Sequence, residues 1–201
     1  MPLIFFIKST TVEISKYTIK DLLGSSGRLD VISRCILAAL LGGDDCFEKN
    51  VQIWVFLDNY GTYIFDSEKL IYESFPKTEL LLTDYFVNLI KEENLKSNSE
   101  GQSYGLVTTS NMSFIEALNH FINLNYTVFI LEENGENLFK NIDKIRQKMN
   151  DIIFIIGNQS GEIINSKELR AMHLPRISLG TQSYLASSVI RLIKLHLISF
   201  Q

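Results

Sequence analysis

A strand and a glycine turn follow each other in Ile152-Ile-Phe-Ile-Ile-Gly-Asn-Gln-Ser-Gly161. The first five residues are all apolar and mostly β-branched, which predicts a strand buried on both faces. Similar runs occur at Leu3–Ile7, Val51–Leu57 and Tyr126–Leu131, and a weaker one at Arg176–Leu179. Strands of this kind are typical of parallel sheets that helices cover on both sides.

Segments with the apolar period of a helix lie between these strands, at 32–40, 81–90 and 114–121, and a last one runs from about 183 to 198. Ser113-Phe-Ile-Glu116 is a capping box that starts the third of them. The alternation predicts an α/β fold with a mostly parallel sheet flanked by helices. Because no compositional break marks a second unit, we expect one domain over residues 1–201.

The composition is that of an ordinary globular chain, with 46% hydrophobic and 21% charged residues among 201. The apolar runs are far shorter than the ~18 residues of a membrane helix, and no leader precedes the first strand, so we expect a cytoplasmic protein without membrane attachment. Cys35 and Cys46 form no CxxC pair, which predicts reduced, packing thiols. The three histidines lack ligand spacing, so no metal site is expected.

Charge is distributed unevenly along the chain. Residues 1–40 carry a net charge of +2, residues 41–165 carry −10 and residues 166–201 carry +4. If the fold brings the two ends together, they form a cationic face on an acidic body, which suits a nucleic-acid partner. Ordinary solvated charge explains the same pattern, so both interpretations stay open.

The common phosphate-binding fingerprints are missing. The sequence has no GxGxxG after the first strand, no GxxxxGK[ST] and no GxSxG nucleophile elbow. Three turns rich in glycine or hydroxyl groups instead lie near helix starts or strand ends, at Gly24–Asp30, Gly157–Gly161 and Ile177–Gln182. Together they favour a cofactor cleft. Asp30 either positions a substrate group or merely caps the helix that begins there.

The segment Asp21-Leu-Leu-Gly-Ser-Ser-Gly-Arg-Leu-Asp-Val-Ile-Ser-Arg-Cys35 resembles the DLPGS-GRLD-LCRC block of the archaeal tRNA (pseudouridine(54)-N(1))-methyltransferases. The blocks at 131–136, 154–161 and 176–180 resemble the family's LxxNGED, FIIGDHxG and RISLG motifs, in the same order. The resemblance covers nearly the whole chain. It implies the SPOUT superfamily, with a C-terminal trefoil knot at roughly 126–201 and a homodimeric assembly.

The resemblance also implies a chemistry: methyl transfer from S-adenosyl-L-methionine to N1 of pseudouridine in the tRNA T-loop. Arg28 is then expected to steer phosphate or uracil oxygens, and Asp30 to take the N1 proton as a general base. Backbone amides of the knot loops are expected to hold the cofactor. The cofactor-binding residues implied are Leu131, Gly157, Ile177, Ser178, Leu179, Gly180, Thr181, Gln182 and Val189.

Several positions depart from the family's pattern. Asn158 and Gln159 replace an Asp-His pair, and Leu185, Ser188 and Val189 stand where the family has two histidines and a cysteine. These changes remove charge and titratable rings while leaving the fold intact. The alternative function is therefore a divergent paralogue that binds tRNA or another RNA with little methyl transfer, or that acts on another RNA site.

The last helix carries an apolar stripe at helical spacing, formed by Leu185, Val189, Leu192, Ile193 and Ile198. The stripe either forms the interface of a homodimer or packs on the protein's own sheet. The resemblance favours the homodimer.

Overall fold

In the part of the chain that the structure describes, eight strands form one mixed sheet in the order β4-β5-β3-β2-β1-β7-β6-β8. This computed structural model describes residues 2–95, 103–104, 107–140, 142, 145, 151–157, 166–180 and 182–197. Strands β2, β1, β7, β6 and β8 are parallel, whereas β3, β5 and β4 are added in antiparallel pairs. The strand bounds are β1 Leu3–Ser9, β2 Val51–Leu57, β3 Gly61–Asp66, β4 Ser103–Tyr104, β5 Val107–Ser110, β6 Thr127–Asn137, β7 Ile152–Ile156 and β8 Arg176–Ser178.

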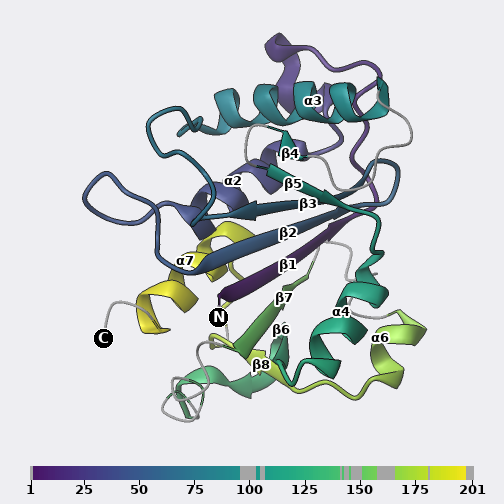
Figure 1. Cartoon of the computed structure of the whole chain (residues 1–201). Helices are drawn as coiled ribbons and strands as arrows, with labels where there is room; N and C mark the ends of the chain where they lie inside the picture. The colour runs from purple at the N-terminus through teal and green to yellow at the C-terminus, as the bar shows by residue number, and fades with distance from the viewer. Residues whose placement is uncertain are drawn as a thin grey trace.

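Helices cover both faces of the sheet (Figure 1). Helices α2, α3 and α7 pack on one face, and α4 and α6 on the other. Among the described helices, none combines the length and apolar character that a membrane crossing needs. The helix bounds are η1 Ile19–Asp21, α1 Leu22–Ser25, α2 Leu29–Leu40, α3 Glu79–Leu95, α4 Phe114–Asn123, η2 Leu138–Lys140, α6 Lys167–Ala171 and α7 Ala186–Leu197.

Strand β1 lies near the middle of the sheet and divides the core. Phe5 joins the cluster under α2, α3 and α7, whereas Ile4 and Phe6 join the cluster under α4 and α6. All three side chains are fully buried. Burial on both faces explains why this run is apolar throughout instead of alternating.

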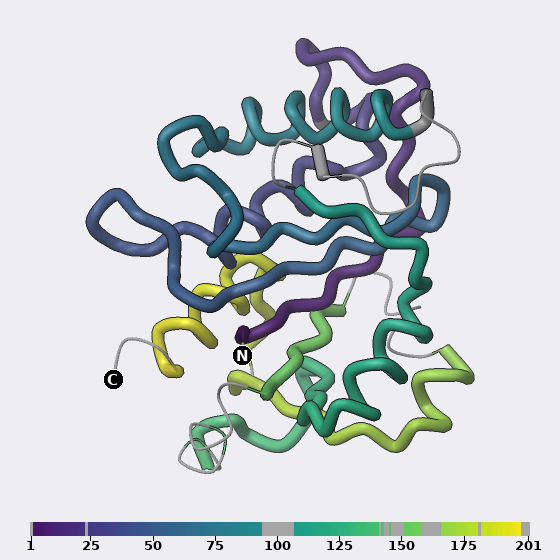
Figure 2. The backbone as a smooth tube through the Cα atoms, in the orientation of Figure 1, coloured from purple at the N-terminus to yellow at the C-terminus, as the bar shows by residue number. Residues whose placement is uncertain are grey.

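Helix α7 is tied to the end of α2, against which it packs (Figure 2). The buried ammonium group of Lys194 donates to the carbonyl oxygens of Ala38 at 2.9 Å and Leu41 at 2.7 Å. It also pairs with Glu48 at 3.3 Å. Burial lowers the pKa of Lys194, and the Glu48 carboxylate opposes that shift. The C-terminal helix is thus fixed by a group that satisfies the last carbonyls of α2.

The α/β class predicted from the sequence is confirmed, and the bounds of β2 and β7 match the predicted runs. The capping box at Ser113 is present in full. The strands β3, β4 and β5 were not predicted, and the last helix begins at Ala186, three residues later than expected. Because much of 141–165 lies outside the described residues, the trefoil knot and the single SPOUT domain stay predictions.

Candidate functional site

A cavity of about 890 Å³ opens at the carboxyl ends of the parallel strands. Residues from β1, β6, β7 and β8 line it, together with the beginnings of α2 and α7. The carboxyl ends of parallel strands meet at one edge of a sheet, and open α/β proteins bind ligands there. The volume falls in the range of about 300–1,000 Å³ that is typical of small-molecule sites.

One part of the cavity, which we call the backbone end, is formed by Leu131–Asn134 and Ile177–Gly180. Ile177 pairs with Leu131 and again with Glu136, so residues 132–135 leave the ladder between β6 and β8. Gly135 permits this arrangement, because a Cβ there would lie 2.5–2.7 Å from backbone atoms of Ile177. The close approach of two main chains shapes this wall of the cavity.

The segment that leads into α7 completes the backbone end. Gly180 has a φ of +123°, a conformation that residues with a side chain rarely adopt. After this turn, Gln182 and Tyr184 line the cavity, and Val189 of α7 lies behind them. The strand, the glycine turn and the helix start therefore surround one side of the cavity.

Another part of the cavity lining, which we call the charged end, contains Lys8, Arg28 and Arg34. Arg28 is the N-cap of α2 and has a left-handed φ of 71°. The preceding Gly27 has a φ of +58°, and the Thr11 hydroxyl donates to its carbonyl oxygen at 3.0 Å. A Cβ at Gly27 would lie 2.0 Å from the Thr11 carbonyl oxygen, so the turn that places Arg28 depends on glycine.

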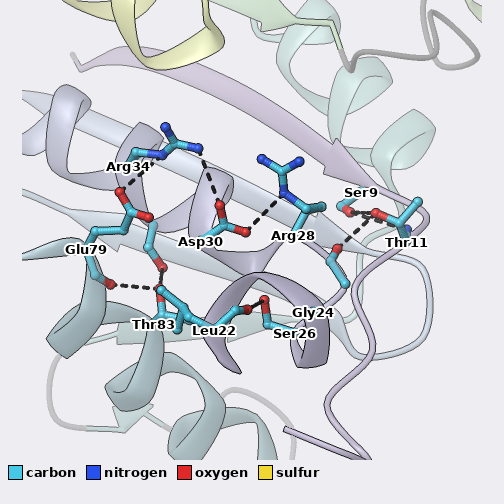
Figure 3. A network of polar contacts seen from close by, with 12 residues as sticks. Ser9, Thr11, Leu22, Gly24, Ser26, Arg28, Asp30, Arg34, Glu79 and Thr83 are labelled. Atoms are coloured by element: carbon cyan, nitrogen blue, oxygen red, sulfur yellow. Dashed lines mark hydrogen bonds and ion pairs between the residues drawn. The ribbon is translucent and has the colours of Figure 1, made fainter. Parts of the chain in front are cut away.

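Asp30 lies between the two arginines, as Figure 3 shows. Its Oδ1 accepts from Nε of Arg28, and its Oδ2 accepts from Nη2 of Arg34, each at 3.3 Å. The Asp30 side chain is fully buried, whereas the side chains of Arg28 and Arg34 are 49% and 33% exposed. Arg28 and Arg34 line the cavity, whereas the buried Asp30 is not among its lining residues.

The charge network continues to α3. Nε of Arg34 lies 3.2 Å from Oε2 of Glu79. Close by, the Thr83 hydroxyl lies 2.8 Å from that of the buried Ser33 and 2.7 Å from the Glu79 carbonyl oxygen, with which it hydrogen-bonds. Helix α3 therefore supplies a second carboxylate to Arg34, next to that of Asp30 (Figure 3).

Two further ion pairs border the cavity. Glu132 pairs with Arg176 across β6 and β8, and Lys8 pairs with Asp58 at 3.0 Å. Cys35, on the wall formed by α2, is almost fully buried, and burial raises its pKa to about 12. The thiol is therefore protonated at neutral pH and does not supply a nucleophile.

Nearly all of the predicted site residues lie around this one cavity. Arg28 lines it, as do all of the predicted cofactor residues except Thr181, which lies outside the described residues together with Asn158 and Gln159. The interpretation of Asp30 as a helix cap is wrong, because Arg28 occupies the N-cap position and the Asp30 carboxylate is engaged by two arginines. The prediction of two packing thiols holds for Cys35 only, because Cys46 is exposed.

Sequence reasoning missed Arg34 and Lys8 as cavity residues. Arg34 stands four positions after Asp30, the spacing at which two side chains meet on a helix. That spacing could have identified it. Lys8 directly follows the predicted first strand, Leu3–Ile7, and only the strand order reveals which loops lie beside it.

The fold and the cavity define a class: an α/β protein that binds a small organic ligand at the carboxyl edge of its parallel strands. A family model described as "Putative SAM-dependent RNA methyltransferase" matches residues 3–201. The chain belongs to this family of S-adenosylmethionine-dependent RNA methyltransferases. S-adenosylmethionine is accordingly its cofactor.

Two relatives are similar over almost their full lengths. The chain is 28% identical to the tRNA (pseudouridine(54)-N(1))-methyltransferase of Pyrococcus abyssi, over 96% of both chains. It is 26% identical to the enzyme of the same name from Thermococcus onnurineus, over 96% of this chain and 95% of that one. The crystal structure of Archaeoglobus fulgidus Nep1 bound to S-adenosylhomocysteine has a similar fold, with a TM-score of 0.62, 14% identity and coverage of 98% and 97%.

Proposed function

We propose that this protein methylates N1 of pseudouridine in the T-loop of tRNA, at position 54. The observation that carries the proposal is the two-ended cavity: main-chain loops at one end suit the cofactor, and arginines at the other end suit an RNA nucleotide. The relatives that share this chain's full length bear the name of that activity. Their agreement with the cavity supports the pseudouridine substrate.

The backbone end suits S-adenosylmethionine, because Gly135 lets β6 approach Ile177 and Gly180 makes the turn with φ +123°, which together shape a wall of main chain. We propose that Leu131, Gly157, 177–182 and Val189 hold the cofactor. When bound, the cofactor supplies a methyl group on a sulfonium, which a nucleophilic ring nitrogen can accept. The proposed tasks of the chain are to hold the uracil ring beside that group and to exclude water.

At the charged end, Arg28 is proposed to contact phosphate or uracil oxygens. The N1 proton of pseudouridine has to leave as the nitrogen gains its methyl group. The general-base role of Asp30 stays a prediction. It requires the carboxylate to come within hydrogen-bond reach of that proton, and in this structure both of its oxygens face guanidinium groups.

The test uses tRNA transcripts that carry either pseudouridine or uridine at position 54. The purified protein is incubated with each transcript and S-adenosylmethionine, and the nucleosides are analysed by mass spectrometry. We expect N1-methylpseudouridine from the first transcript and no methylated product from the second. Methylation at another position, or equal methylation of both transcripts, would overturn the proposed site.

A second function is favoured by one observation. Leu185, which stands where the family has a cofactor-proximal polar residue, is 58% exposed at the cavity edge. A protein that binds tRNA without methyl transfer accounts for such a loss. It predicts tRNA binding without N1-methylpseudouridine in the assay above, whereas the methyltransferase predicts both.

We also propose that the protein acts as a homodimer in the cytoplasm. Tyr184, Leu185 and Leu195, which lie on or next to α7, are 41%, 58% and 48% exposed. Part of the predicted stripe packs on the protein's own core instead, since Ile193 is fully buried and Val189 contacts the main cluster. Ile198 lies outside the described residues. Light scattering should give about twice 23.0 kDa, and a monomer at micromolar concentration would contradict the dimer.

A further inference from the structure

We propose that Arg28 and Arg34 together bind one phosphodiester group of the RNA, and that the buried Asp30 is the positioning residue that holds both guanidinium groups in place. The proposal rests on the function proposed above and deepens it. It adds Arg34 to the residues that contact RNA. It also assigns Asp30 a role that differs from proton transfer.

The first argument is that the two oxygens of the Asp30 carboxylate bind different arginines. Each of its oxygens accepts from a different arginine at the same distance, 3.3 Å. A carboxylate buried without partners is costly, and one that accepts from two guanidinium groups is stabilised as an anion. Both oxygens are engaged on the side of the arginines, so the geometry suits an anchor.

The second argument is what the arginines leave available. A guanidinium group has five N–H donors in a planar fork. Arg28 directs Nε to Asp30, and its two terminal nitrogens point away from that carboxylate (Figure 3). Arg34 donates from Nη2 to Asp30, and its Nε forms an ion pair, but no hydrogen bond, with Glu79. Its Nη1 is left for another acceptor. Donors from two guanidinium groups at one end of the cavity suit the geometry of a phosphodiester.

The third argument is how firmly the pair is held. The left-handed turn at Gly27 and Arg28 is pinned by Thr11, and Arg34 lies between Asp30 and Glu79. Two long side chains that are already ordered lose less entropy when they bind an anion. The acids that line the cavity, Glu132 and Glu133, belong to β6 at the backbone end, where Glu132 is paired with Arg176.

The experiment compares Arg34→Gln, Arg34→Lys and Asp30→Asn with a charge-matched control, Lys69→Gln. Lys69 follows β3, and its side chain is 58% exposed and pairs with Asp66. It is not among the residues that line the cavity. Methyl transfer is measured over a range of tRNA concentrations at saturating S-adenosylmethionine, from pH 6 to 9. Binding of tRNA is measured separately by filter retention between 50 and 200 mM salt. Calorimetry with S-adenosylhomocysteine checks that each variant is folded.

We expect Arg34→Gln to raise KM for tRNA roughly 10-fold, to change kcat less than about 3-fold and to lower the salt slope of tRNA binding by about one. Arg34→Lys should keep the salt slope and recover only part of the affinity, because a point charge replaces a planar fork. Asp30→Asn should raise KM in the same way, with the pH profile of kcat unchanged. Lys69→Gln should leave both parameters unchanged.

Two results would overturn the proposal. If Arg34→Gln leaves KM and the salt slope unchanged in a folded protein, Arg34 does not contact RNA. If Asp30→Asn lowers kcat about 100-fold at constant KM and removes a limb of the pH profile, Asp30 is the general base. The salt slope is read without methyl transfer, so the arginine pair is tested even if the wild-type protein makes no N1-methylpseudouridine and the proposed function fails.

Discussion

The two ends of the cavity differ in which part of the polypeptide forms them, main chain or side chains. At the backbone end the wall is main chain, formed where β6 leaves its ladder and passes Ile177. At the charged end the wall carries the side chains of Arg28 and Arg34, which ion pairs link to Asp30 and Glu79. Main chain recognises a cofactor by shape, whereas guanidinium groups recognise charge. Substitutions at the two ends should therefore impair different properties: cofactor binding at the backbone end and methyl transfer at the charged end.

The largest effect is expected from Gly135→Ala. The added methyl would lie 2.5 Å from a backbone carbon of Ile177, and neither strand can move without breaking the ladder. We expect S-adenosylhomocysteine binding to fall by more than ~100-fold and the free energy of unfolding by about 2 kcal/mol. Calorimetry and urea unfolding measure the two effects.

Gly43→Ala is the matched control, because no atom of the described residues lies within 4 Å of a Cβ at that position. It should bind the product of the cofactor as the wild type does. If Gly135→Ala does so too, the approach of β6 to β8 does not shape the cofactor site.

Gly27→Ala should instead lower methyl transfer and leave cofactor binding nearly unchanged. The Thr11 carbonyl oxygen excludes a Cβ and the φ of +58° disfavours one, so the turn must shift and carry Arg28 with it. A displacement of about 1 Å is enough to lower methyl transfer by up to ~100-fold. Because the backbone end is not touched, the affinity for S-adenosylhomocysteine should change by less than about 3-fold.

A Gly27→Ala protein that loses cofactor affinity as well would show that the two ends are coupled. Retention of full activity would show that Arg28 is not needed where the structure places it. Activity and calorimetry on the same preparation separate these outcomes.

The backbone end was the easier of the two to predict. Apolar runs such as 152–156 fix strands, and glycines after strand ends mark the loops that meet at the sheet edge. The block at 176–180 therefore indicated both a strand and its turn. The departure of 132–135 from the ladder could not be predicted, because it depends on which strand lies beside β6.

The charged end shows what sequence patterns leave out. Arg28 and Asp30 were identified by resemblance, but the burial of Asp30 and its second partner depend on packing against α3. Sequence patterns also missed β3 and β5, of which β3 pairs antiparallel with β2 and β5 pairs antiparallel with β3. Their runs mix polar residues such as Thr, Ser and Asp with the apolar ones, so tertiary pairing decides whether they form strands.

A smaller effect is expected from Lys194→Met, which cuts the link between the helices that carry the two ends. The carbonyl oxygens of Ala38 and Leu41 and the Glu48 carboxylate would lose a donor. We expect the free energy of unfolding to fall by about 1–2 kcal/mol, with both binding affinities unchanged. Urea unfolding measures this loss, and Lys167→Met, at an exposed position on α6, serves as the control.

If Lys194→Met instead weakens the binding of cofactor and tRNA together, the two ends depend on one another through α2 and α7. The two ends would then form one cooperative site. An unchanged free energy of unfolding would contradict the structural role given to Lys194.

The smallest effect concerns Cys35, on the wall between the two ends. Burial raises the pKa of its thiol from 9.0 to about 12 in the folded protein. As the pH rises past 9, the unfolded chain therefore releases this proton first, and the folded state loses stability between pH 9 and 12. At pH 9.5 the expected loss relative to pH 7 is about 1 kcal/mol.

Cys35→Ala should show a shallower decline in the free energy of unfolding than the wild type over this range, whatever its stability at pH 7. Cys46→Ser removes an exposed thiol and should keep the wild-type decline. Equal slopes in Cys35→Ala and the wild type would mean that water reaches the thiol through the cavity, and that the wall between the two ends is open to solvent.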